Sequence, residues 1–239
     1  MKIGFIQTSA IGDILIALPA AKWYVDRGFD VYWPIDSRFY EFYKKSAPYI
    51  NFLSVDHNSI PIDYWLEKPK SLLKNNHIKD VFILYHYLGT NQGRYDFGQP
   101  MHLVESLKFD EYKYAICSAP FEQKWNLDIE RDLNAENLIL EKISAHVPFK
   151  IAHEAPAGKR RNIVDEIEEL HDIRTIHPTS LTNNPLDWLS AFEMSQIILC
   201  EDSVFANLTE QRNLTQKKYL FLRSPIQNTP VFKNGWIFK

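Results

Sequence analysis

The chain has 239 residues, of which 45% are hydrophobic and 24% are charged, and its formal net charge at pH 7 is −3. These values are typical of a soluble globular protein with a buried core, folded as one large domain or two small ones. The weak negative charge gives no general attraction to nucleic acids or anionic membranes, although it is compatible with a local basic groove.

The two cysteines and the lack of a long apolar run bear on the cellular compartment. Cys117 and Cys200 lie far apart, each beside an apolar segment, as reduced core thiols do. No stretch approaches the roughly 18 apolar residues of a membrane span. The apolar segment 14–21 follows Gly12-Asp13 and a leader with a single lysine, unlike a signal peptide. We therefore expect a cytoplasmic protein without a membrane span.

The first element is a strand–loop–helix unit. Residues 3–6 are mostly apolar, and an apolar stripe at helical spacing begins at Ile14. In an open α/β sheet, the loop after such a strand faces the ligand crevice. Three small residues leave room there for an acceptor close to the backbone: Ser9, Ala10 and Gly12. Asp13 stands at the helix start, where it either meets a substrate hydroxyl or satisfies the free N–H groups and the helix dipole.

The rest of the first half alternates strands with helices, which favours a parallel, doubly wound sheet. The expected strands and helical regions are 31–33, 38–47, 52–55, 61–76 and 81–85.

A polar stretch, residues 86–102, follows the strand at 81–85 and holds three of the eight glycines. Long polar loops after buried strands often carry sites, although a flexible surface excursion fits equally well. We expect an acceptor-binding loop, because it leaves the same sheet edge as the Asp13 loop. Its candidates are His86, Arg94 and His102. The two histidines lack a third ligand at metal spacing, so no metal site is expected.

A second α/β series follows a connection with little periodicity, so we expect domains at residues 1–118 and 119–239. Asn184-Pro185 is typical of a helix start. The other expected helices are 135–145, 162–170 and 203–211. The expected strands are 149–153, 174–176, 196–200 and, as the last one, 219–222. Ser203 and the backbone N–H groups at its helix start would suit a phosphate, although a serine cap explains Ser203 equally well.

Two parts of the chain resemble one enzyme family. The strand at 3–6 leads into Ser-Ala-Ile-Gly-Asp at 9–13 and a helix with Ala-Leu-Pro-Ala at 17–20. This resembles the amino-terminal signature of the heptosyltransferase-like (ADP-heptose–lipopolysaccharide type) glycosyltransferases. Residues 181–189 and 198–203 resemble that family's donor region in order and spacing. Together the two regions make up about a quarter of the chain.

The resemblance implies a GT-B-like α/β fold, with two Rossmann-like, doubly wound domains and an interdomain cleft. It also implies a nucleotide-sugar donor, bound mainly by the second domain as a co-substrate, and transfer without a metal or another cofactor.

The same resemblance assigns roles to several residues. Asp13 matches the catalytic carboxylate, a general base that takes the proton from the acceptor hydroxyl. Asp202 and Ser203 match the donor-phosphate loop. Val204 and Asn207 depart from the family pattern, which has a small glycine and a histidine at these places.

Further donor-binding candidates lie at the ends of the preceding strands. Lys159, Arg160 and Arg161 form a basic loop whose charges face either the donor or solvent. Glu154 and His153 end a strand and are placed to touch the ribose or base of the donor. His177 also ends a strand and suits a structural role equally well.

The leading hypothesis is therefore an inverting, metal-independent glycosyltransferase. One variant transfers the sugar to hydroxymethylated bases of viral DNA, with Lys217, Lys218 and Lys233 lining a phosphate groove. The departures at Val204 and Asn207 support a non-catalytic member that binds a nucleotide or a partner, and an epimerase or hydrolase of this fold is a further alternative. The acceptor, whether a glycan or modified DNA, the donor sugar and the oligomeric state do not follow from the sequence.

Overall fold

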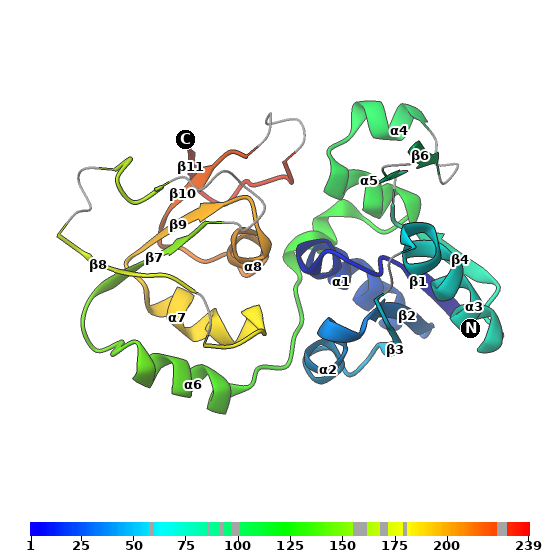
Figure 1. Cartoon of the computed structure of the whole chain (residues 1–239), viewed down its shortest axis with the longest axis horizontal. Helices are drawn as coiled ribbons and strands as arrows, with labels where there is room; N and C mark the ends of the chain where they lie inside the picture. Colours follow the sequence, from blue (N-terminus) through cyan, green and yellow to red (C-terminus); the bar gives the residue numbers. More distant parts are fainter. Residues whose placement is uncertain are drawn as a thin grey trace. The chain divides into compact units, whose positions relative to one another are not determined.

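The computed structural model describes residues 1–57, 60–85, 87–90, 93–96, 101–154, 162–167, 172–178, 181–223 and 229–239 (Figure 1). The chain divides into two compact units, Met1–Glu130 and Arg131–Lys239. Each unit contains a parallel sheet with helices, so the expected α/β class is confirmed. In the described part of the chain, none of the helices has the length and apolar character needed to span a bilayer.

The sheet of the first unit has the strand order β3-β2-β1-β4, and all its pairs are parallel. Its strands are β1 (Lys2–Ile6), β2 (Asp30–Asp36), β3 (Asn51–Val55) and β4 (Asp80–Ile83). The chain moves outward from β1 to β3 and then crosses back to β4. The loop after β1 therefore lies at a topological switch point, which is where open α/β sheets bind ligands.

Helix α1 (Ile11–Val25) is the central helix of this unit. Residues 14–21 are all buried, because α1 packs against the sheet and also against α5 (Phe109–Ile116) and the 3-10 helix η2 (Phe121–Trp125). A helix that is apolar on every side is typical of such a buried position. The remaining helices are α2 (Ser37–Ser46), the π-helix η1 (Asp63–Glu67), α3 (Lys68–Asn75) and α4 (Met101–Ser106).

The polar stretch 86–102, expected as a loop, contains regular structure. Strands β5 (Tyr87–Thr90) and β6 (Gly93–Asp96) form an antiparallel hairpin, and α4 begins at Met101. The loop interpretation is therefore wrong for these residues. The glycines at 89 and 93 favour a turn between two strands. The alternation of apolar and polar residues on either side is too short to predict the strands themselves.

The segment that follows α5 packs on the first unit. The ring of Phe121 lies edge-on to Tyr114, with centroids 5.4 Å apart, and the backbone N–H of Glu130 donates to the Ser46 carbonyl at 2.8 Å. Residues 119–130, which were expected in the second domain, thus belong to the compact unit that ends at Glu130.

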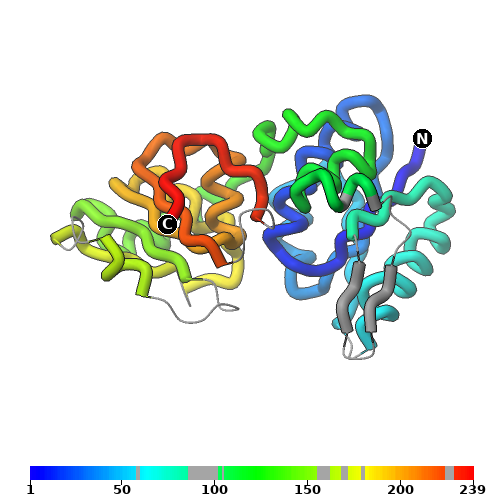
Figure 2. The backbone as a smooth tube through the Cα atoms, turned by 90° about the horizontal axis from the view of Figure 1, so that it is seen from above, coloured from blue at the N-terminus to red at the C-terminus, as the bar shows by residue number. Residues whose placement is uncertain are grey.

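The second unit has a parallel sheet in the order β11-β10-β9-β7-β8. Its strands are β7 (Phe149–His153), β8 (Arg174–Ile176), β9 (Ile197–Glu201), β10 (Lys217–Phe221) and β11 (Trp236–Phe238). Here the switch point lies between β7 and β9, since the chain runs from β7 to β8 on one side and from β9 to β11 on the other. Figure 2 shows the last segment, in red, running beside the orange segment of β10.

Side chains of this sheet alternate between two buried clusters. Ile198 and Cys200 of β9 belong to one cluster, whereas Ile197 and Leu199 belong to the other. Because both faces are covered, β9 reads as a continuous apolar run rather than as an alternating one. The helices of this unit are α6 (Leu133–Lys142), the 3-10 helix η4 (Pro185–Trp188), α7 (Leu189–Met194) and α8 (Val204–Gln211).

Two local expectations for the second unit are wrong. The described residues 162–167 form turns rather than the first part of a helix over 162–170, and residues 168–170 lie outside the described part. The strand at β10 is not the last, because β11 pairs with it in parallel.

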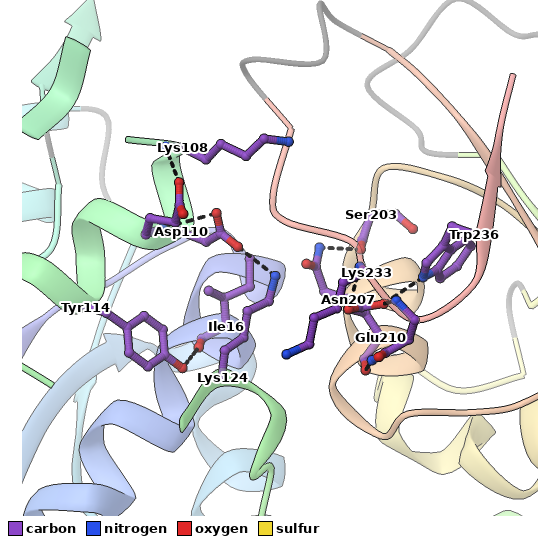
Figure 3. Close-up of polar contacts among 12 residues, drawn as sticks. Ile16, Lys108, Asp110, Tyr114, Lys124, Ser203, Asn207, Glu210, Lys233 and Trp236 are labelled. Atoms are coloured by element: carbon purple, nitrogen blue, oxygen red, sulfur yellow. Dashed lines mark hydrogen bonds and ion pairs between the residues drawn. The ribbon is translucent and has the colours of Figure 1, made fainter. Parts of the chain in front are cut away.

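Glu210 connects α8 to the segment that leads into β11. Its fully buried carboxylate accepts from Trp236 Nε1 at 2.8 Å, from the backbone N–H of Lys233 at 3.0 Å and from that of Asn234 at 3.3 Å (Figure 3). A buried carboxylate needs such donors to offset the loss of water. The edge strand β11 is therefore held in place by a single side chain as well as by its ladder.

We expect Glu210→Ala to lower the free energy of unfolding of the second unit by about 2–3 kcal/mol, because it leaves three donors without this acceptor. Urea denaturation followed by tryptophan fluorescence measures the change. The control is Glu141→Ala on the exposed side of α6, which should stay within about 0.5 kcal/mol of the wild type. Equal losses in both variants would contradict this role of Glu210.

Candidate functional site

The loop after β1 is held by two side chains and by the backbone of Asp36. The Tyr85 hydroxyl accepts from the backbone N–H groups of Thr8, at 2.5 Å, and Ser9, at 3.0 Å. Trp33 Nε1 donates to the Gln7 carbonyl at 3.2 Å, and Thr8 in turn accepts from the Asp36 N–H at 2.9 Å. These contacts fix the backbone immediately before α1, where the sequence predicts a site.

Asp13 lies in the first turn of α1, and Ala10 takes the N-cap position with a φ of 65°. Ala10, and not Asp13, is the N-cap residue, and among the described residues no side chain forms a capping hydrogen bond at this position. Its carboxylate still lies at the positive end of the helix dipole. Gln7 Nε2 donates to the Asp13 Oδ2 at 3.5 Å.

The environment of Asp13 favours a basic carboxylate. Burial raises the pKa of Asp13 above its usual value, the positive charge of Lys113 opposes this rise, and the negative charge of Asp110 adds to it. A carboxylate that has lost solvation and has a raised pKa is a stronger base than one in water. The geometry and the electrostatics both suit proton abstraction.

Three charged residues of α5 and η2 are buried in the same unit as Asp13, and they were not identified from the sequence. Lys113 is 2% exposed, and Asp110 and Lys124 form a buried ion pair at 2.6 Å (Figure 3). Lys113 donates to the Gln7 Oε1 at 2.6 Å and to the Leu84 carbonyl at 3.2 Å. Nothing in the local sequence distinguishes these side chains from surface charges, because their partners lie far away along the chain.

The acceptor-binding candidates are only partly brought together. Ser9, Ala10 and Gly12 surround the start of α1 beside Asp13, and each retains some exposure. His102 lies on the exposed side of α4. Arg94 pairs with Gly89 in the hairpin, with its side chain outside the described part, and His86 lies outside the described residues altogether.

The second unit gathers polar groups at the carboxyl ends of its strands. His153 ends β7, and its Nδ1 lies 3.1 Å from the Ser203 Oγ, which follows β9. Ser203 is the N-cap of α8, as predicted, and its Oγ accepts from the Ala206 N–H at 3.4 Å. The His153 ring also contacts Phe205 edge-on, with centroids 4.6 Å apart. The start of α8 is thereby attached to the end of β7.

The surroundings of His153 disfavour its protonation. Burial is the main reason why the pKa of His153 is lowered to about 4, and the neighbouring Arg223 and His177 contribute in the same direction. Arg223 follows β10 and is exposed, and His177 follows β8 and is also exposed. The ends of four neighbouring strands thus bring the imidazoles of His153 and His177, the Ser203 hydroxyl and the Arg223 guanidinium to one region.

This region has the chemistry of an anion site. Backbone N–H groups at the start of α8 and the positive end of its dipole favour a phosphate, and a guanidinium can bind two phosphate oxygens at once. The predicted residues Asp202, Ser203 and Val204 lie together at this helix start, and Glu154 directly follows His153; all four are partly exposed. Lys159, Arg160 and Arg161 lie outside the described residues.

Arg223 was not predicted, although a signal was available. It stands two residues after β10, at the same sheet edge as Ser203. Asn207, one of the departures from the family pattern, is buried in α8 and donates from its Nδ2 to the Ser203 carbonyl at 2.9 Å (Figure 3). It therefore supports the helix start.

The expected basic groove is wrong for Lys218, which is 2% exposed and donates to the Leu214 carbonyl. Lys217 begins β10, at the sheet edge opposite the anion site, and Lys233 is exposed. Within the described ranges, no group of three or more His, Cys, Asp or Glu residues is arranged to hold a metal ion.

Solved glycosyltransferases share this fold. The match to the glycosyl transferase family 9 protein from Veillonella parvula covers 100% of this chain and 86% of the chain of that protein, with a TM-score of 0.56 and 11% identity. The iron-containing dodecameric glycosyltransferase TibC from enterotoxigenic E. coli matches 100% of this chain and 62% of its own, with a TM-score of 0.56 and 12% identity. The E. coli heptosyltransferase WaaC with ADP gives a TM-score of 0.48 at 13% identity, over 95% of this chain and 92% of its own. No protein-family model and no curated protein matches the chain.

We expect His153 to remain neutral in the folded protein down to about pH 4. In the unfolded chain this group takes up a proton near pH 6.5, so the folded state should lose stability as the pH falls from about 6.5 to 4. An NMR titration of the imidazole nitrogens measures the midpoint. Arg223→Gln removes a positive neighbour and should raise that midpoint, whereas an unchanged value would contradict the clustering of the two side chains.

Proposed function

We propose that the chain is an inverting glycosyltransferase that moves a sugar from a nucleotide-sugar donor to an acceptor hydroxyl without a bound metal. One observation carries the proposal. A single chain with the fold of known glycosyltransferases carries a carboxylate of raised pKa at the switch point of one sheet, and a serine-capped helix start near a histidine and an arginine at the switch point of the other. These groups would supply the general base and the phosphate binding that sugar transfer requires.

In the proposed reaction, Asp13 acts as the general base. Its carboxylate takes the proton from the acceptor hydroxyl while that oxygen forms a bond to the anomeric carbon of the donor sugar. The bond between the anomeric carbon and the diphosphate oxygen breaks, and its electron pair leaves with the nucleoside diphosphate. Because attack and departure occur on opposite faces of the sugar, the configuration inverts.

The second unit would hold the donor. The negative charge that grows on the departing diphosphate would meet the N–H groups at the start of α8 and the Arg223 guanidinium. Ser203 would donate its hydroxyl to a phosphate oxygen, with His153 holding its orientation. Fixed donors of this kind would take over the role that a divalent cation has in metal-dependent transferases. The proposal requires Asp13 and this donor site to meet in one interdomain cleft during turnover.

Donor binding is tested first. A thermal-shift screen of nucleoside diphosphates and their sugar derivatives should identify a ligand that raises the melting temperature, because it binds only the folded state. Isothermal titration calorimetry with the best ligand should show a loss in affinity of about 10-fold or more in Arg223→Gln, since a charge-assisted hydrogen bond is lost. The control Arg27→Gln removes an exposed guanidinium from the first unit and should bind like the wild type.

Asp13→Asn tests the chemical step. The variant should bind the nucleoside diphosphate normally but lose about 10²-fold or more of the sugar transfer, because an amide does not accept the proton. Release of the diphosphate is measured with panels of glycans and of hydroxymethylated duplex DNA as acceptors. Asp26→Asn, at the exposed end of α1, is the matched control. Full activity of Asp13→Asn would exclude it as the base.

The same assay separates the alternatives. Nucleotide binding without turnover on any acceptor would favour a non-catalytic member of the fold, in line with Val204 and Asn207. Transfer to modified DNA alone would identify the viral-DNA variant. Release of a rearranged or free sugar without an acceptor would indicate an epimerase or a hydrolase.

A further inference from the structure

Lys113 is buried on α5 within the part of the first unit that carries Asp13. We propose that Lys113 is a positioning residue for Asp13 and that it acts through the side-chain amide of Gln7. The inference deepens the proposed function, on which the catalytic role of Asp13 rests. Lys113 is remote from Asp13 in the sequence and lies outside the motif that contains Asp13.

The contact with Lys113 fixes the orientation of the Gln7 amide. A lysine ammonium carries only donors, so the atom that faces it at 2.6 Å must be the amide oxygen, Oε1. The amide nitrogen then points to the other side, where it donates to the Ser9 carbonyl at 2.9 Å and to the Asp13 Oδ2 at 3.5 Å. Lys113 therefore decides which end of Gln7 faces the carboxylate.

These groups have little freedom to rearrange. Gln7 is fully buried and Lys113 is 2% exposed, so no solvent is at hand to replace a lost partner. The Leu84 carbonyl, which directly follows β4, accepts a second hydrogen bond from the ammonium at 3.2 Å. Lys113, Gln7 and Asp13 thus form a relay of hydrogen bonds, which connects α5, the residue after β4 and the β1 loop to the Asp13 Oδ2. In the described part of the chain, Gln7 donates to Oδ2 and not to the other carboxylate oxygen, Oδ1.

Charged and phenolic groups also surround the Asp13 carboxylate. Lys113 is the positive group that faces Asp13, Asp110 is a negative one, and Tyr43 and Tyr85 are the phenols that sense the charge of Asp13. Lys124 is paired with Asp110. Burial lowers the pKa of Lys113, which the negative charges of Asp13 and Asp110 oppose, and burial raises the pKa of Asp13, which the positive charge of Lys113 opposes. Each group therefore favours the charged form of the other, and an ionised Asp13 is the state that proton abstraction needs.

A direct titration tests the proposal. The carboxyl carbon of Asp13 is followed by 13C NMR in the full chain and assigned by its absence in Asp13→Asn. Lys113→Met should raise the midpoint of Asp13 by about one pH unit or more, which is the usual effect of losing a close opposite charge. The control is Lys150→Met, which removes another buried lysine in the second unit and should leave the midpoint unchanged. An unchanged midpoint in a folded Lys113→Met variant would overturn the proposal.

The role of Gln7 is tested by combination. Gln7→Met alone should also raise the midpoint, and the double variant should shift it by less than the sum of the two single changes. Strict additivity would show that Lys113 acts without Gln7 and would overturn the relay. Where Lys113→Met does not fold, the reciprocal measurement is available, because Asp13→Asn keeps the shape of the side chain. The midpoint of the Lys113 ammonium should fall in Asp13→Asn, and an unchanged value would overturn the proposal.

These titrations do not depend on turnover, so the two proposals fail separately. A midpoint that moves with Lys113 in a chain without transferase activity would retain the positioning role and remove the proposed function. Where activity is present, the acidic limb of kcat/KM should move to higher pH in Lys113→Met together with the Asp13 midpoint. If activity depends on Asp13 but the acidic limb of kcat/KM is unchanged in Lys113→Met, the positioning role alone is removed.

Discussion

The buried ammonium of Lys113 is the constraint on which the first site depends. An ammonium without water needs acceptors and negative charge around it, because its desolvation is costly. Gln7, the Leu84 carbonyl and the carboxylates of Asp13 and Asp110 meet that need. The β1 loop and the first turn of α1 can therefore adopt few other arrangements. A strained start to α1, with a positive φ at Ala10, is held within this frame.

The second unit places different groups at the switch point of its own parallel sheet. At its sheet edge, the imidazole of His153 stays neutral and Arg223 and His177 contribute positive charge. Burial is the main cause of the lowered pKa of His153, and the Arg223 guanidinium adds to it, because a positive neighbour disfavours a further proton and favours an anion. A carboxylate site and an anion site thus arise at equivalent places in two sheets, and the difference lies in a few side chains at the strand ends.

Short-range patterns predict part of this structure well. The apolar run of β9 and the caps at Asn184 and Ser203 depend on neighbours within a few residues, so the sequence shows them. Helix α5 was missed because its buried residues include Asp110 and Lys113, which hide the apolar stripe. Strand β11 has three residues and relies on pairing with β10 and on Glu210, 26 residues earlier. The candidate site divides in the same way, since Asp13 and Ser203 follow from local motifs whereas Lys113 and Arg223 follow from contacts across the chain.

A buried lysine also bears on the relation between stability and function. Replacing a buried ion by an apolar side chain of similar volume is often neutral or stabilising, because the desolvation penalty disappears. Gln7 Nε2 would keep its hydrogen bond to the Ser9 carbonyl, whereas Gln7 Oε1 would lose the ammonium as its partner. Loss of the ammonium would therefore act first on Gln7 and, through it, on Asp13. A buried lysine whose charge reaches a carboxylate at a switch point is best explained by the chemistry of that carboxylate.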